Sequence, residues 1–515
     1  MDRLDRGRAE IPATAALVAA ALVCAVALYL RSSGLAGGSI AFDEADYAYA
    51  ASRGLWTNWW DQSGGLNGDL RHWHAPLSMY LIGLSTAAFG TIEWAVRLPG
   101  VIAGAGACTA MTLATIDLAD GSPRARLAAG VLGGLLLATA PASIGLAGTA
   151  TPHTVVELLL VLNLWSLARY ARRPSTKGAA WFGLSLGGQF VTMDYGFIIL
   201  GLALVAVALS AAWRFGAGGG TAPRVSPGRH MLACGLACGV VVLALWPAGV
   251  LKAGVVRNLM YYVEYARHGH ATLFLGQIHQ QVPKWAYAWW YWESFPVLLL
   301  AMLAGLVLLG VWVVRTRDAT AIVMGVFAAG LLASIHASHI MHLKYSAFAL
   351  PAVLLGGVLA GGWSWRALLP YDGGRGRASR VTAAALLVIA AAGVAGGSVT
   401  RGPPDDTADN AKRLAIRAVP RFMPGDRVVA YPWPILRYVA HLEMGRPDIQ
   451  VLEFSPNQTR REAASLKRLQ AGEAEWAYIR EPLGGIRDSP VFRFLVASYV
   501  LADQEGDVRL FRRPR

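Results

Sequence analysis

Residues 11–30 read IPATAALVAAALVCAVALYL, an apolar run long enough to cross the hydrocarbon core of a bilayer as a helix. Runs of about this length recur through a chain of 515 residues, of which 55% are hydrophobic and only 15% are charged. The pattern predicts a mainly α, polytopic transmembrane helical bundle. No clear small-residue cleavage motif accompanies the first run, so we expect it to be retained as a span rather than removed as a signal peptide.

The distribution of Lys and Arg predicts how the spans are oriented, because cytoplasmic loops of membrane proteins are rich in both residues. With the N-terminus in the cytoplasm, every second connection is basic, whereas connections 148–153 and 193–195 contain neither residue. We therefore predict a multi-pass protein of an inner (plasma) membrane, and the Ala-, Gly- and Arg-rich composition favours a bacterial one. About eleven spans are expected, near residues 11–30, 96–118, 127–147, 154–170, 178–192, 196–213, 231–249, 293–314, 319–336, 346–365 and 381–399.

One apolar stretch, Pro76–Gly90, is too short for a comfortable span, and counting it as one would invert the charge pattern of everything downstream. We therefore predict an external juxtamembrane or re-entrant helix there. Two long external loops result, residues 31–95 and 250–292. The second loop is rich in Trp, Tyr and His, which suits the headgroup region of a membrane.

The adjacent carboxylates Asp43 and Glu44 stand just past the first span, in the first external loop. Charged groups at the edge of a bilayer are costly and usually mark a functional site. The alternative is a solvated helix start, because Asp and Glu favour the first turn of a helix.

The composition changes after the last span. Residues 400–515 are more charged, and strand-like runs alternate with helical ones. We predict a small extracytoplasmic α/β domain there, with a supporting or acceptor-binding role, beside a transmembrane module of residues 1–399. The expected strands are residues 427–431, 449–454, 476–479 and 508–511, and the expected helices are residues 435–442 and 460–469.

All four cysteines fall inside expected spans, so no disulfide framework is predicted. Cys234 and Cys238 lie one helical turn apart, and we interpret them as small-residue packing rather than as a metal site. His336, His339 and His342 share one helical face and could bind a metal ion only if a fourth ligand were added. We name no metal ligands.

A resemblance to a known family comes from the order of several motifs. An external FDEADYA segment at 42–48 matches F-D-E-x-x-Y-A, HAPLSMYL at 74–81 matches H-x-P-L-x-x-Y-L, and EWAVRLP at 93–99 leads into the second span. The combination resembles the GT-C glycosyltransferases over roughly residues 1–365, and within them the protein O-mannosyltransferase and aminoarabinose-transferase branch. Such enzymes transfer a sugar from a polyprenyl-phosphate donor to an acceptor on the non-cytoplasmic face, usually with inversion.

The resemblance implies catalytic roles for the acidic pair. The aspartate of the D-E pair acts as the base in the similar families, which makes Asp43 the candidate that takes the proton of the acceptor hydroxyl. Glu44 would orient the site or hydrogen-bond the sugar or acceptor. Whether a divalent metal is used stays open, because lipid-sugar transferases differ on this point. No other cofactor is expected.

Several further residues are candidates for binding the donor. His74 stands where related enzymes have a His or Lys before prolines, and it would contact the phosphate. Tyr47 matches the aromatic residue of D-E-x-x-Y. The remaining candidates are external polar groups near bilayer depth, where a cation suits a lipid phosphate but also snorkels for structural reasons: His270, Lys284, Lys344 and Tyr345.

The chain departs from related patterns at 150–154, ATPHT, where relatives often carry an aspartate; His153 or Glu157 could contribute instead.

Two other function classes fit the sequence less well. A transporter or flippase for lipid-linked sugars would keep its ionisable residues near the midplane and show repeated halves, and neither feature is visible here. An inactive relative that binds envelope glycans is disfavoured by the intact acidic pair. The expected partners are a polyprenyl-phosphate sugar and a protein, lipid or glycan acceptor, with no nucleic acid.

Overall fold

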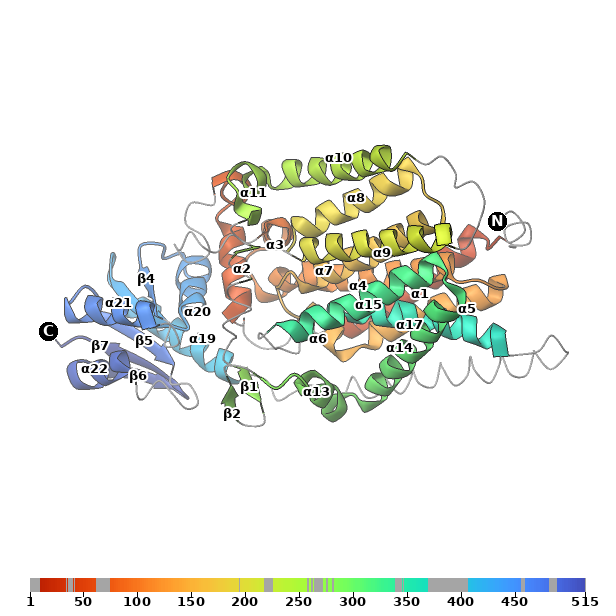
Figure 1. The fold of residues 1–515 in the computed structure, drawn as a ribbon. Coiled ribbons are helices and arrows are strands. Elements are labelled where there is room, and N and C mark those ends of the chain that lie inside the picture. The colour runs from red at the N-terminus through yellow and green to blue at the C-terminus, as the bar shows by residue number, and fades with distance from the viewer. Residues whose placement is uncertain are drawn as a thin grey trace.

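In the computed structural model, the chain forms a bundle of long apolar helices with a small sheet at one end (Figure 1). The structure describes residues 10–33, 35, 40, 42–61, 75–193, 195–216, 226–256, 259–260, 263, 272–274, 277–279, 282–338, 345, 347–368, 406–454, 459–480 and 489–514. The helices before the sheet are α1 (Ala13–Ser32), α2 (Phe42–Ser52), η1 (Thr57–Asp61), α3 (Leu77–Phe89), α4 (Glu93–Leu118), α5 (Pro123–Thr139), α6 (Pro141–Ala147), α7 (His153–Arg172), α8 (Thr176–Phe190), α9 (Gly196–Gly216), α10 (Pro227–Leu245), α11 (Pro247–Leu251), α13 (Ala286–Ser294), α14 (Pro296–Thr316), α15 (Ala319–Ala337) and α17 (Leu350–Leu368), with a short hairpin of β1 (Thr272–Phe274) and β2 (Gln277–His279) between α11 and α13.

The predicted helical membrane fold is confirmed. Among the described residues, seven helices are long and apolar enough to cross a membrane, and eight if α5 and α6, which meet at a bend of 62°, form one broken span. Helix α8, at 15 residues, and the apolar part of α17, Leu350–Ser364, coincide with predicted spans but are shorter. Helix α3 matches the predicted short helix of the first loop, and the predicted span 381–399 lies outside the described residues.

Side-chain caps begin several helices at the end of the bundle that carries the basic connections. Ser122 and Ser226 cap α5 and α10, each with Pro at the first helical position, and Ser175 caps α8. Asp318 caps α15 by accepting hydrogen bonds from the backbone N–H groups of Thr320 and Ala321. Such caps satisfy amides that a helix start leaves unpaired, so the local sequence fixes where these helices begin.

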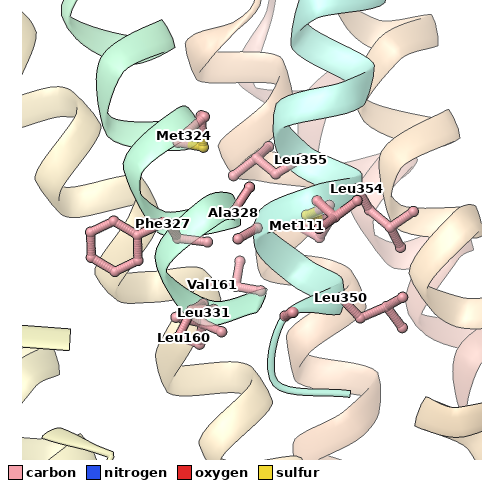
Figure 2. Close-up of a cluster of buried hydrophobic side chains, with 14 of the residues drawn as sticks. Met111, Leu160, Val161, Met324, Phe327, Ala328, Leu331, Leu350, Leu354 and Leu355 are labelled. Atoms are coloured by element: carbon pink, nitrogen blue, oxygen red, sulfur yellow. The ribbon is translucent and has the colours of Figure 1, made fainter. Parts of the chain in front are cut away.

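The core of the bundle is a large apolar cluster around α4, which packs against α1, α5 and α7. Figure 2 shows the part of this core where α15 and α17 meet α4 and α7. The side chains drawn there are aliphatic or aromatic and almost wholly buried, for example Met111, Phe327 and Leu355. Helices with this much buried apolar surface form the interior of the bundle, whereas α10 and α14 expose much of theirs.

Helices α8 and α10 approach closely through glycines. A Cβ atom on Gly183 would lie 2.2 Å from the backbone oxygen of Cys234, and one on Gly187 would lie 2.9 Å from that of Cys238. Both cysteines are free thiols. The close approach of the two helices agrees with the prediction of small-residue packing at these positions.

The C-terminal part contains a five-stranded sheet in the order β4-β3-β5-β7-β6. The three strands β4, β3 and β5 are parallel, and β7 and β6 are antiparallel. Helices α19 and α20 cover one face, and α21 and α22 cover the other. The elements are α19 (Asp406–Ala418), η2 (Val419–Arg421), β3 (Arg427–Tyr431), α20 (Trp433–Arg437), η3 (Tyr438–Glu443), β4 (Gln450–Glu453), α21 (Thr459–Gln470), β5 (Trp476–Arg480), α22 (Pro490–Ser498), β6 (Val500–Glu505) and β7 (Val508–Arg512).

The sheet lies at the end of the bundle where α2 lies (Figure 1). Helices α4 and α7 also begin at this end: Arg97 near the start of α4 and Ala150 just before α7 both contact Glu44 of α2. The C-terminal ends of α4 and α7 lead into basic turns at the other end of the bundle. The α/β part and the acidic motif are therefore neighbours in space. The proposed boundary at 399/400 lies outside the described residues.

Candidate active site

Helix α2 carries the acidic motif, and its two adjacent carboxylates point in different directions. Asp43 is exposed in the first turn, whereas the side chain of Glu44 is 2% exposed. Consecutive residues on a helix lie about 100° apart, so one of the two can face the bundle while the other faces solvent. The carboxylate of Asp43 near the positive end of the helix is also favoured by the helix dipole.

Glu44 is anchored by a buried ion pair with Arg97 in the first turns of α4. Arg97 Nε donates to Glu44 Oε1 at 2.8 Å and Arg97 Nη2 donates to Oε2 at 3.0 Å, in the two-pronged geometry that a guanidinium and a carboxylate favour. The backbone N–H of Ala150 donates to the same Oε1 at 2.9 Å. The acidic motif is thus tied to two other segments of the bundle.

This ion pair joins two of the motifs on which the family resemblance rests, FDEADYA and EWAVRLP. The sequence alone gives Arg97 no individual role. A charged residue in the apolar run that opens a span is the signal that could have identified it, because such a residue needs a partner.

Asp46 follows Asp43 by one turn, so the two lie on the same side of α2. Its side chain is half-buried, but Oδ1 is shielded from solvent and accepts no hydrogen bond from any described residue. Burial holds the pKa of Asp46 well above its usual range; the Asp43 and Glu453 carboxylates raise it further, while Arg437 lowers it. Tyr47, the fourth polar residue of the motif, is 8% exposed and packs in the apolar cluster that α2 shares with α19 and α20.

The C-terminal part docks on this region through polar contacts as well. Lys412 Nζ lies 2.6 Å from a carboxylate oxygen of Glu93 at the start of α4 and 2.6 Å from one of Glu443 in η3. The hydroxyl of Tyr438 donates to the backbone oxygen of Thr91 at 3.2 Å. The ring of His441 lies 5.6 Å from that of Tyr49 on α2. The acidic helix is therefore enclosed between the bundle and the sheet domain.

The connection between α6 and α7 extends the site. His153 Nδ1 lies 2.8 Å from the hydroxyl of Thr151, close to the Ala150 amide that binds Glu44. Its ring stacks on Phe348 with centroids 5.5 Å apart, and it lies 6.0 Å from the ring of Tyr345. The structure thus brings Tyr345, a predicted donor-binding residue, to the same end of the bundle as α2.

Other predicted site residues are spread more widely. Lys284 is exposed ahead of α13, and its Nζ donates to the backbone oxygen of Ser338 at 2.6 Å, at the end of α15. His74, His270 and Lys344 lie outside the described residues. Among the described residues, no cluster of three His, Cys, Asp or Glu side chains is arranged to hold a metal ion.

A second buried charge joins the end of α1 to α5 and α6 in the interior of the bundle. Arg31, at the end of α1, donates to the backbone oxygens of Leu137 and Ala138 at 3.2 and 3.1 Å and to Ser143 Oγ at 2.7 Å. Ser143 in turn donates to Glu157 Oε2 at 2.7 Å. The guanidinium satisfies carbonyls that the end of α5 leaves open, so it stabilises the break into α6. Glu157, a suggested substitute for the missing aspartate, contributes to this connection.

No protein-family model matches the sequence, and no curated protein matches it. Solved structures do match. ArnT from Cupriavidus metallidurans bound to undecaprenyl phosphate superposes with a TM-score of 0.64 at 15% identity, over 97% of this chain and 98% of that one. The oligosaccharyltransferase AglB from Archaeoglobus fulgidus, in complex with an inhibitory peptide and a dolichol-phosphate, gives a TM-score of 0.58 at 14% identity over 90% and 69% of the two chains.

A third match is the arabinofuranosyltransferase AftD from Mycobacteria, with a TM-score of 0.55 at 15% identity; it covers all of this chain but 40% of the longer protein. The chain thus has the fold of GT-C membrane glycosyltransferases, as the sequence predicts. Within that class it is similar to ArnT over nearly the full length of both chains.

Proposed function

We propose that this protein is an integral membrane glycosyltransferase that moves a monosaccharide from a polyprenyl-phosphate donor to an acceptor hydroxyl, with inversion at the anomeric carbon. The observation that carries the proposal is the acidic helix α2. Glu44 is locked to Arg97 and the Ala150 amide, and this anchor presents Asp43 to solvent at the end of a GT-C bundle. Two of the matching structures hold undecaprenyl phosphate and dolichol-phosphate, so the fold accommodates lipid-phosphate carriers.

In the proposed reaction, Asp43 takes the proton of the acceptor hydroxyl while the oxygen of that hydroxyl attacks the anomeric carbon of the sugar. The bond from that carbon to the phosphate oxygen breaks, and the polyprenyl phosphate leaves with the electron pair. Cationic or hydrogen-bonding groups must hold the leaving phosphate as its charge grows. The candidates for this role remain His74, Tyr47, His270, Lys284, Lys344 and Tyr345.

We further propose that the site and the sheet domain, residues 400–515, face the extracytoplasmic side of a bacterial inner membrane. The helix starts capped by Ser122, Ser175 and Ser226, each of which lies in a basic connection of the sequence, are at the opposite end of the bundle, which suits a cytoplasmic surface.

The test is transfer of label from radiolabelled polyprenyl-phosphate sugars to a membrane extract by purified protein in detergent. Wild type should transfer, and Asp43→Asn should lose at least about a hundredfold in rate, as expected when a general base is removed. Asp120→Asn, at the opposite end of the bundle, is the matched control and should retain full activity. A parallel reaction with a chelator decides the metal requirement.

Two outcomes would contradict the proposal. Full activity of Asp43→Asn would mean that this carboxylate is structural. If wild type transfers no sugar from any donor but moves labelled lipid-linked sugar across vesicle membranes, the transporter alternative would replace the transferase.

A further inference from the structure

The sheet domain does more than support the bundle, because it places a cation against α2. Arg437, the last residue of α20, lies with its guanidinium carbon 5.0 Å from the ring centre of Tyr49 on α2 and 4.5 Å from that of Trp433. Its Nη2 also donates to the backbone oxygen of Val451 at 3.3 Å. Two aromatic faces and a carbonyl thus fix the position of this guanidinium at the interface.

Arg437 lies close enough to α2 to interact electrostatically with an acidic residue of that helix. Asp46 lies in the electrostatic field of Arg437, and its buried Oδ1 accepts no hydrogen bond from the described residues. The other charged or titratable groups around the pair are Asp43, Tyr49 and Arg53 on α2 and the turn after it, His441 in η3 and Glu453 at the end of β4. Asp46 and Glu453 therefore both interact electrostatically with Arg437, and Asp43 acts on Asp46 from the same helix.

The topology of the sheet explains why these groups meet. β3, β4 and β5 are parallel, so they end at the same edge of the sheet, at Tyr431, Glu453 and Arg480. α20 starts directly after β3 and runs along α2. In parallel α/β sheets, ligands bind outside the carboxyl ends of the strands, and it is this edge that α20 connects to the acidic helix.

We propose that Arg437 is a positioning residue of the transfer centre: it holds the acidic face formed by Asp43 and Asp46 in its working arrangement. This inference rests on the proposed glycosyltransferase function, whereas the interaction of Arg437 with α2 is independent of it. Arg437 acts through Asp46 and need not touch a substrate.

The first experiment is a double-mutant cycle on thermal unfolding of the purified protein in detergent, followed from pH 5 to 9. The folded protein favours the protonated form of Asp46, so this group contributes stability at low pH that is lost as the pH rises through its raised pKa in the folded state. Arg437→Met should therefore lower Tm by several degrees at high pH and by less at low pH. In an Asp46→Asn background, the difference between high and low pH should shrink, and what remains comes from His441, whose pKa is lowered by burial and by Arg437.

An additive cycle, in which Arg437→Met lowers Tm by the same amount with and without the Asp46→Asn substitution at all pH values, would overturn the inference. This readout needs no substrate. It also separates a charge interaction from lost packing, because packing is the same at each pH.

The second experiment measures the pH dependence of kcat/KM with a donor that wild type uses. Removal of the positive charge makes the carboxylates on this face of α2 harder to ionise. Arg437→Met should therefore lower kcat/KM and move the acid limb of the pH profile, where the rate falls with falling pH, upward by about one pH unit. Arg437→Lys should restore the limb. Lys412→Met is the matched control: it weakens docking at Glu93 and Glu443 and should lower the rate without moving the limb.

Equal effects of Arg437→Met and Lys412→Met, with the limb unmoved, would reduce Arg437 to a docking residue and overturn the inference. No transfer by wild type together with a coupled cycle would contradict the glycosyltransferase proposal instead, and with it the role of Arg437 in transfer.

Discussion

At the scale of single residues, neighbouring carboxylates on α2 meet opposite environments. Glu44 is buried against Arg97, while Asp43 is exposed one position earlier. A buried carboxylate whose oxygens are already occupied by a guanidinium and an amide is an anchor, and an exposed one beside it can exchange a proton with a substrate. Substitutions at the two positions should therefore differ in kind: at Glu44 they should affect folding, and at Asp43 they should affect turnover.

Glu44→Gln should destabilise the protein by about 3–5 kcal/mol, because it leaves Arg97 charged and uncompensated in the interior. The expected readout is a lower Tm in detergent. The double variant Glu44→Gln with Arg97→Met should lose less than the two single variants added together, since neither charge is then stranded. Asp448→Asn, which breaks a surface ion pair with Arg446, is the control and should change Tm little. Additive losses would show that the ion pair is not what fixes α2.

At the scale of elements, the pairing of α8 with α10 shows how the local sequence sets helix spacing. Gly183 and Gly187 fall on one face of α8, four residues apart, and each meets the backbone of α10. At Gly183 the neighbouring atoms all belong to the main chain of Cys234, so they cannot move aside as a flexible side chain would. The four-residue spacing of Cys234 and Cys238 is visible in the sequence and predicts close packing, but the sequence does not show which helix is the partner.

Gly183→Ala should lower Tm, because its methyl group would clash with the oxygen of Cys234 and force α8 away from α10. Overpacking of this kind costs about 1–3 kcal/mol. The control is Gly235→Ala on α10, where a Cβ would meet nothing within 4 Å and where Ala improves helix propensity. A Gly183→Ala variant as stable as this control would mean that the two helices can separate without loss.

At the scale of the whole molecule, features encoded locally could be predicted, whereas long-range pairings could not. Apolar length predicted most of the long helices, and strand-like runs predicted β3, β4, β5 and β7. β6 was missed because it is an exposed strand without apolar alternation, at the edge of the sheet beside β7. The contacts of Glu44 with Arg97, and of Arg437 with α2, join segments far apart in the chain, and no periodicity encodes such a contact.

The arrangement of the two ends predicts how the molecule sits in its membrane. If the basic turns face the cytoplasm, Asp120, exposed in the turn between α4 and α5, lies inside, whereas Met423, which is 66% exposed on the sheet domain, lies outside. In spheroplasts, a membrane-impermeant maleimide should label an Met423→Cys variant at once. An Asp120→Cys variant should be labelled only after permeabilisation.

Unmodified protein is the background control for this labelling, because its four cysteines lie within helices of the bundle and Cys108 is buried. The expected pattern would place α2, and with it Asp43, on the extracytoplasmic face, where a lipid-linked sugar and an envelope acceptor can meet. The reverse pattern would put the acidic helix and the sheet domain in the cytoplasm. The same bundle would then have to take its donor from the inner leaflet, and the proposed extracytoplasmic reaction would be wrong even if Asp43 proved to be the base.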